Sequence, residues 1–138
     1  YKLSSVTASQ KTVSTGGAQT IAGVKTIDEG AIVTAPNTYA PAAAGTATLD
    51  LSLANDHEIT MPAGNITIAI SNATVGQKFT VSTLQDGVGS RTVTWFTTIR
   101  WADGTVPTPT TTASKRDWFG FKVTGASTYD GVIIGQNI

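Results

Sequence analysis

The chain lacks cysteine, and among its 138 residues it has only one histidine, His57. The absence of cysteine excludes disulfides, thiolate metal sites and cysteine nucleophiles. A single histidine excludes a metal site with several histidine ligands, and it cannot serve a Ser-His-Asp triad built elsewhere in the chain. In a strand, the flanking Asp56 and Glu58 point to the face opposite His57, so the three cannot converge on one ion. We therefore expect no metal here and place His57 at a solvated edge or turn.

Charge is also scarce, since only 13% of the residues are charged and nine basic residues balance nine acidic ones. Neither sign forms a run, so we expect no nucleic-acid partner and no general binding to anionic membranes. No apolar stretch approaches the roughly 20 residues of a membrane-spanning helix. A surface of threonine, serine and alanine suggests an extracellular or particle-borne protein. Because the chain begins with Tyr1, we expect a piece of a longer chain.

Residues 1–45 contain mostly threonine, serine, alanine and glycine, with isolated valine and isoleucine. Such a stretch buries too little apolar surface to offset its ordering entropy unless something else covers it. Ile21, Val24 and Ile27 are spaced by three, which matches neither a strand nor a sustained helix. Two interpretations remain open: a disordered or extended linker, and a shaft that packs against copies of itself.

From Thr46 onward, apolar residues alternate with polar ones, and turn signals recur about every eight to twelve residues. This pattern predicts an all-β head domain over 46–138, an antiparallel, jelly-roll-like β-sandwich. A bulge is expected at Leu84, which falls out of phase. The expected strands lie around 49–53, 59–61, 66–70, 79–81, 93–95, 99–101, 118–123 and 129–134.

The stretch 85–101 concentrates more apolar surface than any other window. Its first half, 86–90, reads Asp-Gly-Val-Gly-Ser, and the glycines and the aspartate favour a turn. Val93 and Trp95 then follow with the period of a half-buried strand. We expect this stretch to form a hairpin. Trp95 and Trp118 are expected to pack in the core or between subunits.

No set of residues marks a catalytic centre. Glycan hydrolysis uses two carboxylates about 5 to 9 Å apart, and the acidic residues of the head all lie beside turns or alternate outward on strands. The Gly-Val-Gly segment at 87–89 is too short for a phosphate loop and precedes a strand, so it indicates a turn. We expect neither an enzyme nor a bound cofactor. The acidic residues of the head are Asp50, Asp56, Glu58, Asp86, Asp103, Asp117 and Asp130.

Three segments together resemble the C-terminal domain that recurs in bacteriophage tail fibres and related virion proteins. They are Asp-Gly-Val-Gly-Ser-Arg-Thr-Val-Thr-Trp at 86–95, Ile-Arg-Trp-Ala-Asp-Gly-Thr-Val-Pro-Thr at 99–108, and Tyr-Asp-Gly-Val-Ile-Ile-Gly-Gln-Asn-Ile at 129–138. Residues 19–27 are similar to segments of tail-fibre shafts. Phe96 departs from the family, in which a proline often follows the first tryptophan.

The resemblance implies a homotrimeric, β-rich tip of a tail fibre, spike or needle, extracellular and attached to other virion tail proteins. Such a tip recognises a host cell-surface glycan or an outer-membrane receptor. Sugar sites combine an aromatic face with converging polar groups. Trp101, with Arg100 and Asp103, and Tyr129, with Asp130, fit that description, so these five residues are the candidate ligand-binding residues. Core packing is the alternative for Trp101 and Tyr129.

Three other functions remain open. A purely structural virion protein, such as a capsid decoration or baseplate domain, predicts exposed apolar patches and no glycan binding. A polysaccharide depolymerase predicts that sugar release depends on one or two of the carboxylates. A carbohydrate-binding module predicts a monomer.

Overall fold

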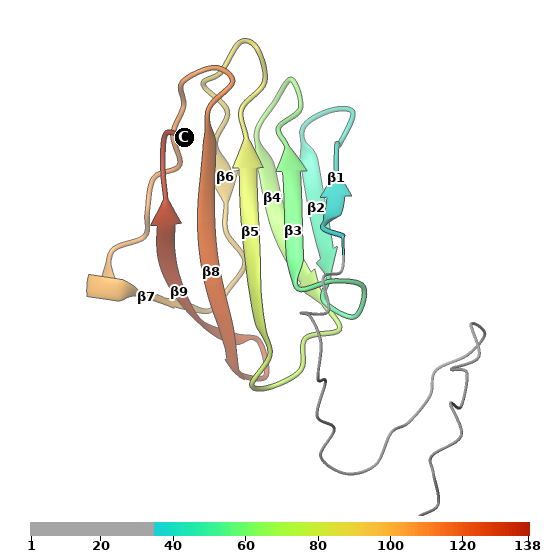
Figure 1. Ribbon diagram of the computed structural model, residues 1–138, viewed down its shortest axis with the longest axis vertical. Helices are drawn as coiled ribbons and strands as arrows, with labels where there is room; N and C mark the ends of the chain where they lie inside the picture. The colour runs from blue at the N-terminus through green and yellow to red at the C-terminus, as the bar shows by residue number, and fades with distance from the viewer. Residues whose placement is uncertain (1–34) are drawn as a thin grey trace, which may run out of the picture. The chain divides into compact units, whose positions relative to one another are not determined.

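Alternating apolar and polar residues form nine β-strands in the computed structural model, which describes residues 35–138 (Figure 1). The only helical element of these residues is a short 3-10 turn, η1 (Ala102–Gly104), so the all-β prediction is confirmed. No helix in the described part is long and apolar enough to cross a membrane. The strands are β1 (Asn37–Tyr39), β2 (Gly45–Asp50), β3 (Asp56–Thr60), β4 (Ile66–Ser71), β5 (Lys78–Leu84), β6 (Val93–Thr94), β7 (Ile99–Trp101), β8 (Arg116–Gly125) and β9 (Thr128–Gly135).

The strands form a six-stranded sheet, in the order β1-β3-β5-β8-β9-β7, and a three-stranded sheet, in the order β2-β4-β6. From β1 to β6 the chain alternates between the two sheets, and each strand pairs in parallel with the strand two before it. Parallel neighbours need a crossover connection, and here the intervening strand of the other sheet supplies it. The chain thus winds in three successive coils.

The last strands break this winding. β8 pairs antiparallel with β5, β9 pairs antiparallel with β8, and β7 pairs in parallel with the far edge of β9. The prediction of antiparallel pairing is therefore right for β5-β8-β9 and wrong for the other pairs, and the jelly-roll arrangement is not confirmed. Side chains alternate with a period of two in both kinds of strand, so the sequence pattern does not distinguish them.

The predicted hairpin at 85–101 is wrong, although its turn forms. Oδ1 of Asp86 accepts hydrogen bonds from the backbone N–H groups of Val88 and Gly89. The chain then continues into β6, which belongs to the other sheet from β5. The predicted bulge at Leu84 is also wrong, because β5 keeps one register with both neighbours. The register shifts fall between β8 and β9 instead.

The core lies between the two sheets, since Leu49 and Ile68 of the small sheet and Phe119 of the large sheet are all almost fully buried. Its centre is aromatic. The rings of Phe79 and Phe121 stack with their centroids 5.1 Å apart. Trp95 packs edge-on against Phe119 at 4.7 Å, as expected of a core residue. Such pairs contribute about 0.5–1.5 kcal/mol each beyond the area they bury.

The predicted collar, 1–45, overlaps the described residues only at its end. Its part from 35 onward carries β1, and its last residue, Gly45, is the first residue of β2. The predicted shaft segment at 19–27 lies outside the described residues.

Candidate functional site

Arg100 and Asp130, two of the candidate ligand-binding residues, are brought together by the parallel pairing of β7 with β9. Nε and Nη2 of Arg100 each lie 2.8 Å from Oδ1 of Asp130. The side chains are 69% and 48% exposed, and an exposed pair of this kind contributes at most about 1 kcal/mol to stability. Its main consequence is that the Asp130 carboxylate is already occupied by a cation.

The two aromatic candidates are buried. Trp101 is 9% exposed and Tyr129 is 4% exposed. The Trp101 ring lies over Gly131, where an added Cβ would come within 2.8 Å of Cε3 of the ring. Tyr129 packs edge-on against Phe96 at 4.7 Å, and burial raises the pKa of its hydroxyl. Neither ring is available to stack on a sugar, so core packing is the role that the structure gives them.

Asp103, the fifth candidate, is exposed within η1 and has a φ of 59°. Among the described residues, no hydrogen bond or ion pair joins it to Arg100 or to Asp130. The structure thus joins Arg100 and Asp130 in an exposed ion pair and places Trp101 and Tyr129 in the core. Asp103 has no side-chain hydrogen bond among the described residues, although it lines a hollow of about 240 Å³ together with the edge of Trp101.

The outer face of the large sheet carries a row of charge that continues from Arg100 and Asp130 across two more strands. Asp130 lies opposite Lys122 of β8, and Lys122 lies opposite Lys78 of β5. Residues directly opposite each other on neighbouring strands project to the same face. The row therefore holds three cations and one carboxylate, in the order Lys78, Lys122, Asp130, Arg100.

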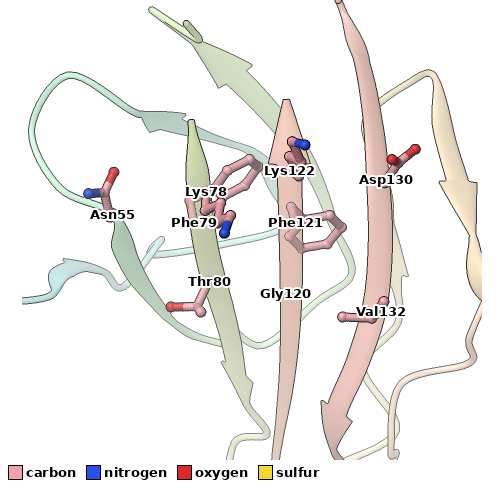
Figure 2. A pocket seen from close by; sticks show the side chains of 9 residues that line it. All are labelled: Asn55, Lys78, Phe79, Thr80, Gly120, Phe121, Lys122, Asp130 and Val132. Atoms are coloured by element: carbon pink, nitrogen blue, oxygen red, sulfur yellow. The ribbon is translucent and has the colours of Figure 1, made fainter. Parts of the chain in front are cut away.

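The next row along the same face forms a groove. Gly120 of β8 lies opposite Thr80 on one side and Val132 on the other. The side chains of Val132 and Ile134 lean over Gly120, since an added Cβ would lie 3.3 Å from Cγ2 of Val132 and 3.2 Å from Cδ1 of Ile134. Gly120 thus forms part of the groove floor beside Val132. The groove has a volume of about 450 Å³, within the usual range of small-ligand sites. Figure 2 shows Lys78 and Lys122 at one end of the groove. It is lined by Asn55, Lys78, Phe79, Thr80, Gly120, Phe121, Lys122, Asp130 and Val132.

A second polar group lies further along this face. Nη1 of Arg116 is 2.8 Å from Oε1 of Glu58 and 3.1 Å from Oγ of Ser82. The guanidinium carbon of Arg116 lies 5.8 Å from the centre of the Trp118 ring. Trp118, which we expected to pack in the core or between subunits, is thus half-buried on the outer face beneath an arginine. These partners leave the Arg116 guanidinium engaged within the protein.

Besides Tyr129, two ionisable side chains of the described residues are buried, Asp117 and His57. Asp117 is 1% exposed, and its carboxylate accepts hydrogen bonds from the backbone N–H groups of Thr110 and Asn137 and, at 3.4 Å, from Nε2 of Gln136. It thereby joins the loop before β8 and the C-terminal residues to β8 itself. The prediction that every acidic residue lies beside a turn or points outward is wrong for Asp117.

His57 is fully buried, so its predicted place at a solvated edge is wrong. Its Nε2 lies 3.0 Å from the carbonyl oxygen of Ala54, and its Nδ1 lies 3.4 Å from the Tyr39 hydroxyl. Burial lowers the pKa of the imidazole. Asp56 and Glu58 project to the other face, as predicted. Among residues 35–138, no three potential ligands lie close enough together to hold a metal ion.

Nearly every carboxylate of the described residues has a protein partner. The hydrogen bond from Asn72, with others from Ser52, lowers the pKa of Asp50, and that from Arg91 lowers the pKa of Asp86. Asp103 is the one for which the described residues provide no hydrogen bond. The partners of the others are Asn72 and Ser52 for Asp50, Thr80 for Asp56, Arg116 for Glu58, Arg91 for Asp86, Thr110, Gln136 and Asn137 for Asp117, and Arg100 for Asp130.

The sequence predicts Arg100 and Asp130 as site residues but does not predict the groove beside them. Lys78, Gly120 and Lys122 come from two strands that are far apart along the chain, and only the register of β5 against β8 makes them neighbours. Only a correct prediction that β5 pairs with β8 would have indicated the groove from the sequence. Each residue alone looks like an ordinary solvated or turn position.

Comparisons of the chain with protein-family models, with curated proteins and with solved structures find no match.

Proposed function

We propose that the chain is the tip domain of a phage virion appendage, a tail fibre, spike or needle, which recognises the host cell surface. The groove on the outer face of β5, β8 and β9 carries this proposal, because it is open to solvent and lies on strands held in register on both sides. The low charge of the chain and the three segments that resemble virion tip domains support it.

The engagement of the carboxylates favours binding over hydrolysis. A glycosidase needs one carboxyl group as the acid and a second as the base or nucleophile. Asp130, the one carboxylate in the groove, is held by Arg100. We therefore propose a non-enzymatic domain, and we assign it no cofactor.

An exposed apolar residue on the inner face of β9 supports the homotrimer that the resemblance implies. Ile133 is 49% exposed, although its ladder partner Phe119 is fully buried. β7 covers the edge of β9 only along Tyr129–Gly131, opposite Ile99–Trp101. Exposed apolar surface that continues from a core is typical of protein interfaces. Three sites on one tip can raise avidity by about two orders of magnitude or more without a strong single contact.

The same apolar surface favours a second candidate function. A structural virion domain, such as a capsid decoration or baseplate component, would use it to contact other virion proteins, with the groove unused. The two candidates differ in whether the isolated chain binds cells.

The test combines light scattering with cell binding. The full chain is labelled at its amino terminus and applied to a panel of bacterial strains, with extracted surface polysaccharide as competitor and an assay for released reducing ends. We expect a mass of three 14.2 kDa chains, binding to some strains only, competition by the polysaccharide of those strains and no sugar release.

Each departure from that result has a meaning. A trimer that binds no strain would favour the structural candidate. A monomer that binds glycan would indicate a carbohydrate-binding module. Release of reducing ends would overturn the non-enzymatic assignment.

A further inference from the structure

We infer that the groove at Gly120 binds an anionic sugar residue, with the acidic group of the sugar placed between Lys78 and Lys122. This inference rests on the proposed function in one respect: it names the class of surface glycan that the tip recognises. The groove itself is defined by strand register and side-chain chemistry alone.

The charge of the row on the outer face is unbalanced. Lys78 and Lys122 lie directly opposite each other, and like charges in that position destabilise a sheet. Asp130, opposite Lys122, is already held by two nitrogen atoms of Arg100. No carboxylate of the described residues lies within 4.0 Å of either lysine amine. An anion between the two lysines removes this repulsion and forms charge-assisted hydrogen bonds.

The groups around the groove combine apolar surface with a hydrogen-bond donor. Val132 and the aliphatic stems of the two lysines offer apolar surface to the C–H face of a sugar ring. Nδ2 of Asn55 donates to no acceptor among the described residues, while Oδ1 of Asn55 accepts from Gln77. Asn55 therefore has a donor free for a sugar hydroxyl. A site with apolar walls and a few polar groups suits a saccharide.

The position of the groove within the sheet favours a sugar over a peptide as the ligand. β5 and β8 are interior strands of the large sheet, so their backbone groups are used by neighbouring strands and a peptide cannot add there as a further strand. Recognition must come from side chains at this shallow floor. That condition favours a ring with hydroxyl groups and one acidic group over an extended acidic peptide.

The test is a titration of the isotopically labelled full chain, followed through its backbone amide NMR signals. The first probe is a tetrasaccharide of alternating glucuronate and N-acetylglucosamine, and chitotetraose is its uncharged counterpart. A glycerol-phosphate oligomer that carries glucose tests a phosphodiester as the source of the negative charge. Polyglutamate tests an acidic peptide.

We expect the amides of Lys78, Gly120 and Lys122 to shift with at least one anionic sugar probe, more weakly at high salt, and not with chitotetraose. Which of the two acidic probes binds identifies a carboxylate or a phosphodiester as the ligand anion. Lys78→Gln and Lys122→Gln should each weaken binding by roughly fivefold, as expected for a partly exposed charge. Lys115→Gln removes the same charge outside the groove and should leave the affinity unchanged.

Several results would overturn the inference. These are no shift in the groove with either acidic sugar, equal binding of chitotetraose, or binding of polyglutamate alone. A Lys78→Gln/Lys122→Gln double variant gives a further test. If it keeps its amide spectrum but binds cells as well as the unaltered chain, the groove is not the binding site, and the proposed function still stands. If the sugar probe binds in the groove but the chain binds no bacterial strain, the inference stands and the proposed function is wrong.

Discussion

Replacing Asp117 with alanine should destabilise the protein more than any exposed acidic substitution. Asp117 is buried and its carboxylate receives two backbone hydrogen bonds, from Thr110 and Asn137. Hydrogen bonds to a charged group contribute about 1.5–3 kcal/mol each, and unpaired buried donors add a further cost. The expected loss for Asp117→Ala is therefore about 3–5 kcal/mol of unfolding free energy.

The assay is urea unfolding followed by tryptophan fluorescence. With a slope of about 2 kcal/mol per molar urea, the midpoint should fall by about 2 M. Asp117→Asn keeps the shape and one acceptor oxygen, so its loss should be smaller. Asp103→Asn is the control for loss of an exposed carboxylate, because Asp103 has no hydrogen-bond partner among the described residues and asparagine tolerates its φ of 59°; its midpoint should not move measurably. If Asp117→Ala and Asp103→Asn had the same midpoint, the assignment of Asp117 as the link between β8, the preceding loop and the C-terminus would be refuted.

Three further predictions concern the core, pH and association. Burial lowers the pKa of His57 from its ordinary 6.5, so the folded state binds fewer protons than the unfolded state. The contribution of His57 to stability is therefore full above about pH 7, and it is lost as the pH falls below 6.5 and through the folded pKa. In His57→Phe, the urea midpoint should no longer fall between about pH 8 and about pH 5.5, a range in which most carboxylates stay ionised. If the variant and the unaltered chain had the same pH dependence, the lowered pKa of His57 would be contradicted. Gly131→Ala should cost about 1–3 kcal/mol, because its Cβ would meet the Trp101 ring; calorimetry checks this, with Gly87→Ala, which meets nothing within 4 Å, as the control. Ile133→Lys should reduce the mass measured by light scattering from that of a trimer to that of a monomer, whereas Val75→Lys, also exposed, should not; a trimer that persists in Ile133→Lys would place the interface elsewhere.

The strand positions could be predicted from the sequence because burial on one face imposes alternation. Ile66 and Ile68 are 2% and 1% exposed, as their phase requires. The pairing could not be predicted in the same way. Alternation is local, whereas the choice between a hairpin and a crossover after Gln85 depends on contacts far along the chain. Nε2 of Gln85 donates to the carbonyl oxygens of Arg91 and Thr110, and no local pattern announces the second of these bonds.

The candidate site could likewise be predicted from the sequence only in part. Arg100 and Asp130 stand out as charged residues beside aromatic ones, and the structure pairs them. The burial of Trp101 depends on Gly131, which it covers only because β7 and β9 pair in parallel in one register. In the sequence, Trp101 and Gly131 are separate features. The local sequence therefore does not distinguish a tryptophan that packs in the core from one that binds a ligand.

The unequal sizes of the two sheets give a physical reason for the association that we propose. Phe119 and Ile133 are partners in the β8–β9 ladder and project to the same inner face. Phe119 is fully buried, whereas Ile133 is 49% exposed. The small sheet has only β2, β4 and β6, against six strands in the large sheet. A sheet of six strands packed on a sheet of three therefore leaves apolar inner surface that its own chain does not cover, and burial of such surface is worth about 25 cal/mol per Å². A second copy or another protein that covered Ile133 would gain that free energy, while the charged row and the groove on the outer face would remain open to a ligand.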